Sequence, residues 1–234
     1  MYPLVPARAA TSVTLPIESR MRLVVPPPGQ FEVALTLDAC PGEFDERIAV
    51  GLIESRIAAT IFVTDLWLLR NPAGLDLLMA HRDLFGIENH GELHIPPVVG
   101  RRRIFGVPTA GNLDAVRREV ERGAAAIGIA TGARPRWYRA ATGYYSPSAM
   151  PEIRQLGFGI AGYSLNADAG ASLPAAAVAA RIGKATSGEV IIAHINQPRR
   201  PSGWGLIAGV RELQRRGASF RRLDQLAPTN FAYA

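Results

Sequence analysis

The chain has 234 residues, 48% of them hydrophobic and 20% charged, which is typical of a globular protein with a large core. The net charge of +6 comes almost wholly from arginine, since Lys184 is the only lysine. The charge could attract an anionic polymer or a membrane surface, but we favour a solvated, salt-bridged surface. No nucleic-acid-binding motif accompanies these arginines, so we expect no nucleic-acid partner. No apolar run is long enough to span a bilayer, which excludes an integral membrane segment.

Residues 1–14 lack the apolar segment of a signal peptide. If a leader had been removed, we would favour an extracytoplasmic location, in the periplasm or cell envelope. Cys40 is the only cysteine, so the chain forms no internal disulfide, and the cysteine content does not point to a redox compartment. The sequence also carries no indication of an oligomeric state.

Short apolar runs alternate with longer amphipathic ones from Phe31 onward, after an irregular N-terminal arm over residues 1–30. In chain order, the short runs predict strands at 31–38, 58–63, 84–88, 134–140, 158–164, 189–195 and 218–223. The longer runs between them predict helices at 43–56, near 76–82, and at 112–128, 148–156, 174–186 and 203–216.

Strict alternation of strands and helices predicts parallel strands covered by helices. Seven such units suit either a closed barrel with one unit missing or a doubly wound sheet. No glycine-rich phosphate loop follows the first strand, which counts against a nucleotide-binding sheet. We therefore predict an α/β fold, a distorted (β/α)7 barrel formed by residues 31–234. Its chemistry is expected at the C-terminal ends of the strands.

Two of the four histidines, His90 and His94, follow the third predicted strand. Residues four apart on a helical turn face the same way, and Pro96 and Pro97 prevent a longer helix, so a short turn is expected to present both imidazoles together. Two imidazoles and a carboxylate can bind a divalent metal and leave positions for water and substrate. The alternative is one core histidine and one surface histidine.

Other polar residues stand at the ends of predicted strands. Asp38 ends the first strand, Arg139 the fourth and His194 the sixth, while Asp168 follows the fifth. This set supports metal-assisted hydrolysis, in which a metal lowers the pKa of water from about 15.7 to about 7. Asp38 would accept a proton from that water, and His194 would protonate the leaving group. The alternatives are that Asp38 only caps the end of a strand and that His194 is a buried histidine hydrogen-bonded to the backbone.

With these residues assembled, the chain resembles the polysaccharide deacetylases, carbohydrate esterase family four, from about residue 31 to residue 223. The resemblance implies a distorted barrel of seven β/α units that removes acetyl groups from N-acetylated sugars with a divalent metal, often zinc. The segment TLDACP at 36–41 is similar to the family's TFDDGP, which makes Asp38 the base. The segment HGELH is similar to the family's H-S/T-x-x-H, which makes His90 and His94 metal ligands.

Three further family motifs survive weakly. The segment RAAT, similar to R-x-P-Y, implies that Arg139 orients the base and that the backbone N–H of Thr142 stabilises an oxyanion. Of the family's D-x-x-D-W motif only Asp168 remains, and the resemblance implies that its carboxylate tunes the residue that acts as the general acid. The segment IAH is similar to L-x-H and makes His194 the general acid.

Ala39 stands where most members carry the aspartate that ligates the metal. Asp38 could move onto the metal, the two histidines could bind it with waters, or the protein could have lost catalysis; we favour the first. The neighbouring Cys40 could ligate zinc or act as a nucleophile, but a small buried residue in a tight turn is the interpretation we prefer.

The leading hypothesis is a metal-dependent hydrolase, with zinc as the expected metal, that cleaves acetyl amides or esters of a carbohydrate. Tyr144 or Tyr145 is expected to contact the sugar, because sugar rings stack on aromatic faces. The alternative is that these aromatic side chains pack in the core or at an interface. One rival is a catalytically inactive carbohydrate-binding protein with the same fold. Another is a hydrolase centred on Cys40, with His194 and Asp168 as partners.

Overall fold

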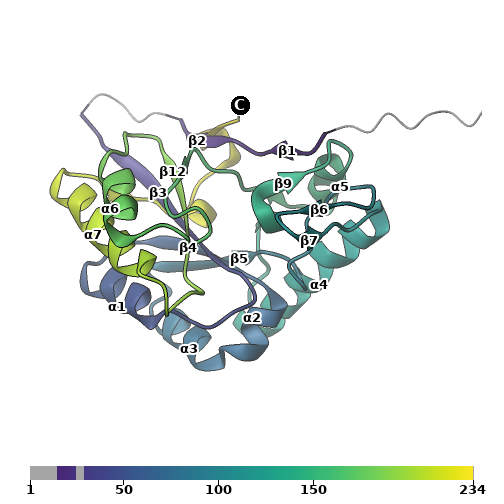
Figure 1. The fold of residues 1–234 in the computed structure, drawn as a ribbon, viewed down its shortest axis with the longest axis horizontal. Helices are drawn as coiled ribbons and strands as arrows, with labels where there is room; N and C mark the ends of the chain where they lie inside the picture. The colour runs from purple at the N-terminus through teal and green to yellow at the C-terminus, as the bar shows by residue number, and fades with distance from the viewer. Residues whose placement is uncertain (1–14, 25–28, 234) are drawn as a thin grey trace, which may run out of the picture.

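The computed structural model describes residues 15–24 and 29–233, and a parallel sheet forms its centre (Figure 1). The sheet has eight strands in the order β10-β8-β5-β4-β3-β12-β11, with β13 paired to β3. Every pairing within it is parallel, which confirms the predicted distorted (β/α)7 barrel. Its strands are β3 (Glu32–Ala39), β4 (Ala59–Val63), β5 (Phe85–Asn89), β8 (Trp137–Tyr138), β10 (Gly159–Ile160), β11 (Leu165–Asn166), β12 (Val190–His194) and β13 (Ser219–Phe220).

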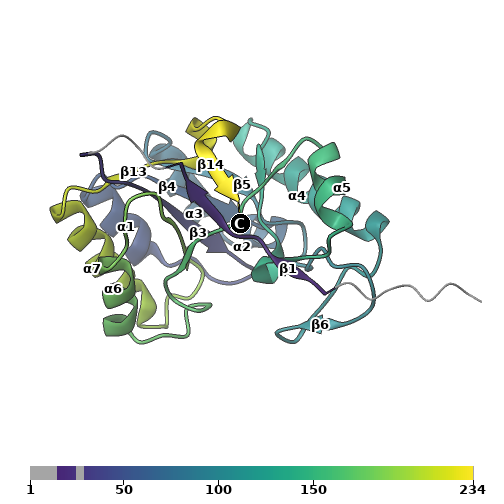
Figure 2. The same cartoon turned by 90° about the horizontal axis from the view of Figure 1, so that it is seen from above.

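Helices cover the outer side of the sheet. In both views α6 and α7 lie at one end of the molecule and α4 and α5 at the other (Figures 1 and 2). Six helices were predicted; α2 was missed, and Thr64 caps it by accepting the N–H of Trp67 at 3.1 Å. The helices are α1 (Glu46–Glu54), α2 (Asp65–Arg70), α3 (Pro72–Ala80), α4 (Leu113–Thr131), α5 (Ala149–Gln155), α6 (Ala175–Gly183) and α7 (Ser202–Arg215). None in the described part of the chain is long and apolar enough to cross a bilayer.

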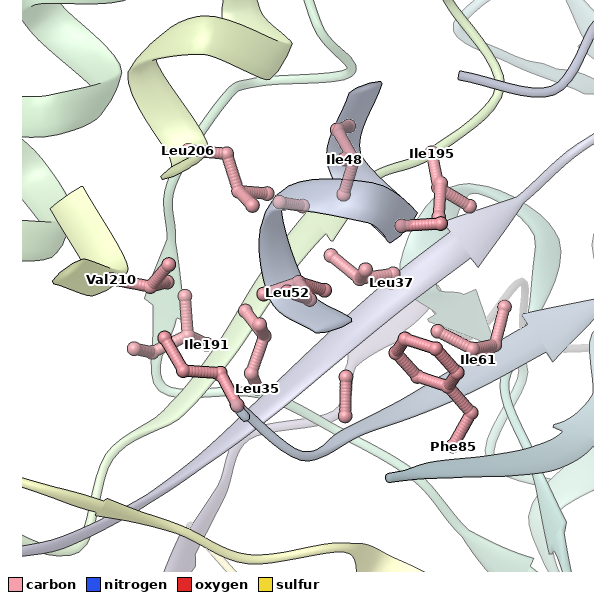
Figure 3. Packing of buried hydrophobic residues seen from close by; sticks show 14 of the residues in the cluster. Leu35, Leu37, Ile48, Leu52, Ile61, Phe85, Ile191, Ile195, Leu206 and Val210 are labelled. Carbon is pink, nitrogen blue, oxygen red and sulfur yellow. The ribbon is translucent and has the colours of Figure 1, made fainter. Parts of the chain in front are cut away.

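Residues of β3 alternate between two buried layers. Leu35 and Leu37 face the helices and pack beneath Ile48 and Leu52 of α1 (Figure 3). Burying one such side chain contributes about 1.5–3 kcal/mol, so this layer fixes α1 against the sheet. Because side chains alternate along a strand, Asp38 faces the opposite side, toward the interior of the barrel.

The described part of the predicted N-terminal arm forms short strands rather than irregular structure. Strand β1 (Ile17–Glu18) pairs antiparallel with β9 (Tyr144–Tyr145), and β2 (Met21–Leu23) pairs with β14 (Phe231–Tyr233). Both β1 and β2 run across the top of the sheet in Figure 1. The rest of the predicted arm, 1–14 and 25–28, lies outside the described residues. A hairpin of β6 (Arg103–Ile104) and β7 (Val107–Pro108) completes the strands.

Candidate active site

A cavity of about 530 Å³ lies where the C-terminal ends of the strands meet. The parallel register of β12 and β3 sets His194 directly beside Asp38, so both side chains reach the same space. The loop after β5 adds His90 and His94, and the segment after β8 adds Thr142. The lining residues are Glu18, Asp38, Cys40, His90, His94, Phe105, Val107, Thr142, Gly143, Tyr163, Asn166, Ala169, Gly170, Ile192 and His194.

Asp38 is held by a buried arginine. Arg139 donates from Nη1 to Asp38 Oδ1 at 2.9 Å and to Thr36 Oγ1 at 2.8 Å, and from Nη2 to the carbonyl of Gly162 at 2.9 Å. The guanidinium carbon lies 4.2 Å from the ring centre of Phe62. Asp38 is 4% exposed and Arg139 only 1%, so the two charges are withdrawn from water together.

The charges around Asp38 keep it ionised. Burial raises the pKa of this carboxyl, but the positive charge of Arg139 and those of His90 and His194 lower it by more. The net pKa lies below the ordinary value of 3.8. Since Arg139 binds Oδ1, the other oxygen Oδ2 is left to face His90, whose Nε2 is 3.7 Å away.

His90 and His94 lie in an irregular loop after β5, so the predicted turn is present but its helical geometry is wrong. Gly91 (φ 94°) and His94 (φ 63°) are both left-handed, which reverses the chain and brings the two ring centres to 4.9 Å. His90 Nδ1 donates to the carbonyl of Arg139 at 2.9 Å. That bond leaves Nε2 facing the sulfur of Cys40, 3.5 Å away.

Glu119 of α4 anchors this loop from behind. Its carboxylate accepts the N–H of Leu93 at 3.0 and 3.1 Å and that of Ile95 at 3.0 Å, on either side of His94. A Cβ at Gly91 would lie 2.3 Å from Glu119 Oε1, so only glycine fits there. Sequence reasoning missed Glu119, although an acid next to Val120 on the apolar face of α4 was a usable signal.

His194 and Asp168 form a second pair. Asp168 Oδ1 accepts from His194 Nδ1 at 2.9 Å, and Oδ2 accepts the backbone N–H of the same histidine at 2.7 Å. Burial lowers the pKa of His194, but the charge and hydrogen bond of Asp168 raise it by more, so the net pKa is well above 6.5. The pairing with Asp168 therefore favours the protonated imidazolium, which can donate a proton from Nε2.

Cys40, His90 and His94 form a compact donor set. The sulfur and one ring nitrogen from each histidine all lie within 4.8 Å of one another. Burial raises the pKa of the Cys40 thiol, but the charges of His90 and His94 and hydrogen bonds with His194 and His90 bring it well below 9.0. Ligands of a tetrahedral zinc ion lie about 3.3–3.6 Å apart, and the sulfur-to-Nε2 distance of 3.5 Å fits that spacing.

The family model for polysaccharide deacetylase matches residues 26–161. The chain belongs to the polysaccharide deacetylase family. No curated protein matches it.

Solved structures of this family share the fold at low identity. A family 4 carbohydrate esterase pseudoenzyme from Bacillus anthracis is 18% identical with a TM-score of 0.67, over 85% of this chain and 66% of its own. The Bc1960 peptidoglycan N-acetylglucosamine deacetylase is 21% identical with a TM-score of 0.70, over 86% of this chain and 90% of its own. PdaA of Bacillus subtilis, a family 4 carbohydrate esterase, is 19% identical with a TM-score of 0.69, over 86% of this chain and 82% of its own.

Most of the residues expected at the site of this deacetylase family member reach one cavity. Thr142 lines it with a left-handed backbone (φ 67°). Tyr144 is not a lining residue, but its ring packs edge-on against that of Phe105, which lines the cavity. Tyr145 is fully buried, and its hydroxyl accepts the N–H of Ala140 at 2.9 Å, so it packs in the core instead of facing a sugar. Glu18 lines the cavity from the N-terminal segment, where no motif indicated it.

Proposed function

We propose that this protein is a metal-dependent hydrolase that removes acetyl groups from an acetylated carbohydrate. The proposal rests chiefly on one observation: a buried carboxylate, a histidine–aspartate pair and a metal-donor set line the same cavity. The family membership agrees with this reaction. Peptidoglycan is one candidate substrate and would require the protein to act outside the cytoplasmic membrane.

Each side chain has a distinct task in this reaction. A bound divalent metal, for which we propose zinc, would polarise the acyl oxygen and lower the pKa of water. Asp38 accepts the proton of the attacking water through Oδ2, since Arg139 occupies Oδ1. His194 then protonates the departing amine or alcohol, and Asp168 keeps its ring oriented. We propose that the backbone N–H of Thr142 stabilises the oxyanion, a contribution of about 3–4 kcal/mol.

The direct test is acetate release from N-acetylated chitooligomers and from peptidoglycan. We expect release to stop after chelation, to return on addition of zinc, and to be lost in His90→Ala. The matched control is His81→Ala, because His81 lies outside the cavity. Acetate release that survives both chelation and His90→Ala would refute the metal mechanism.

A second candidate function is carbohydrate binding without catalysis. It is favoured by the substitution of Ala39 for a metal-ligating aspartate and by the structural similarity to a pseudoenzyme, of which a mutant with restored enzymatic activity is also known. It predicts glycan binding in calorimetry and no acetate release with any metal.

The cysteine-centred hydrolase also keeps a structural basis, because Cys40 and His194 line one cavity. That reaction would continue in the presence of a chelator and stop after alkylation of Cys40. The metal mechanism requires chelator sensitivity instead, so a chelation series separates the two.

A further inference from the structure

Ala39 faces away from the cavity, toward the helices. It is fully buried in the same layer as Leu35 and Leu37, the helix-facing core beneath α1. The two flanking residues, Asp38 and Cys40, line the cavity. Position 39 is therefore part of the packing of this chain, and its methyl group contributes no ligand atom.

Asp38 is already engaged elsewhere. Its Oδ1 is bound by Arg139 at 2.9 Å, and the donor group whose atoms lie mutually within 4.8 Å comprises Cys40 and the two histidines without it. Its other oxygen, Oδ2, is the atom that we propose as the proton acceptor, and a metal bound there would remove that acceptor. Asp38 is therefore better suited to proton transfer than to ligation.

The sulfur of Cys40 lies near both histidines, within 4.8 Å of a ring nitrogen of each. It lies 3.5 Å from His90 Nε2, the spacing of two ligands on a tetrahedral ion. His90 is fixed for ligation by the bond from Nδ1 to the Arg139 carbonyl, the kind of outer contact that metal-bound histidines make. At His94 the support comes from the backbone, because Glu119 accepts the N–H groups of Leu93 and Ile95 on either side of it.

Given the metal-dependent function proposed above, we infer that Cys40 is the third protein ligand, so that the site is Cys-His-His with the ligand moved one residue along the chain from position 39. A thiolate is a soft ligand that favours zinc over magnesium and manganese. The protein should therefore be a zinc enzyme that magnesium cannot activate.

Cobalt substitution tests this inference with a readout independent of turnover. The protein is stripped with a chelator and titrated with Co²⁺ while absorption is recorded. Because Cys40 is the only cysteine, a sulfur-to-cobalt charge-transfer band can come from no other residue. We expect the band in the wild type and in His81→Ala, and its loss in Cys40→Ser.

Zinc affinity gives a second measurement on the same variants. Loss of an outer contact alone weakens metal binding about 10–100-fold, so Cys40→Ser should lose at least as much. Circular dichroism of the metal-free variant separates ligand loss from unfolding.

The outcomes separate this inference from the proposed function. A wild type that binds Co²⁺ through His90 without a charge-transfer band would overturn the cysteine ligand and leave the metal mechanism intact. Unchanged zinc affinity in a folded Cys40→Ser would do the same. A wild type that binds neither metal would overturn both.

Discussion

Replacing Arg139 by methionine tests the buried pair that we propose as the source of the catalytic base. The substitution removes the guanidinium that bonds Asp38 at 2.9 Å and keeps most of the buried aliphatic volume. Asp38 is then a buried carboxylate without its main partner. Removing one member of a buried pair costs about 3–5 kcal/mol, so we expect a loss of that size in the free energy of unfolding at neutral pH.

The pH dependence of this loss has a definite sign. In the wild type the pKa of Asp38 lies below 3.8, so its stabilisation is present above that pH and is lost as pH falls through the folded-state value. Without Arg139, burial becomes the dominant influence and the folded-state pKa of Asp38 rises. The deficit of Arg139→Met should therefore be small at acid pH and grow as pH rises through the interval between the two folded-state values.

Urea unfolding of both proteins from about pH 4 to about pH 7 measures this difference, because other titrating groups cancel between them. The matched control is Arg117→Met, which removes an arginine from an exposed pair with Glu152. Because solvent screens that pair, its removal should change stability far less than removal of the buried pair, with little pH dependence. A deficit of Arg139→Met that is independent of pH, or no larger than the control's, would refute the account of the Asp38 charge.

Three further predictions follow from the same contacts. Glu88 is buried and its pKa is raised to about 8, so native stability should fall as pH rises from 4.5 to 8. Glu88→Gln keeps an oxygen to accept the two N–H groups that meet at Oε2, and in urea unfolding it should be up to about 3 kcal/mol more stable than the wild type at pH 7. The same stability difference between the two proteins at pH 4 would contradict this. Glu119→Ala should weaken zinc binding about 10–100-fold in a competition titration. The control Glu121→Ala, at an exposed side chain of the same helix, should leave zinc affinity unchanged, and equal effects of the two substitutions would exclude the anchoring role. Asp168→Asn removes the charge that raises the pKa of His194, so the alkaline limb of the pH–rate profile should move to lower pH, and an unmoved limb would remove His194 as the acid.

The barrel could be predicted from the sequence because its signals are local. Apolar runs of strand length, such as 31–38 and 189–195, are followed by amphipathic helices, and each became a strand of the sheet. The predicted strand 134–140 is shorter in the structure. The N–H groups of Arg136 and Trp137 donate to the Glu88 carboxylate rather than to a neighbouring strand, and such a contact leaves no periodic signal.

The site was predictable in its residue types and not in its geometry. Motif spacing led to Asp38, His90 and His194, but the loop that carries the histidines depends on a left-handed Gly91 and on a carboxylate from α4, far along the chain. The six residues of α2 are too few for a helical period to emerge, so its cap was the only signal. The inward direction of Cys40 depends on the register of β3, which only the fold reveals.

Anomalous scattering at the zinc edge, recorded from crystals of the zinc-loaded protein, tests the central proposal most directly. We predict one peak in the cavity, at about 2.0–2.1 Å from a ring nitrogen of His90 and of His94 and about 2.3 Å from the sulfur of Cys40. A cavity without a peak under saturating zinc, or a zinc ion bound by residues elsewhere, would contradict it.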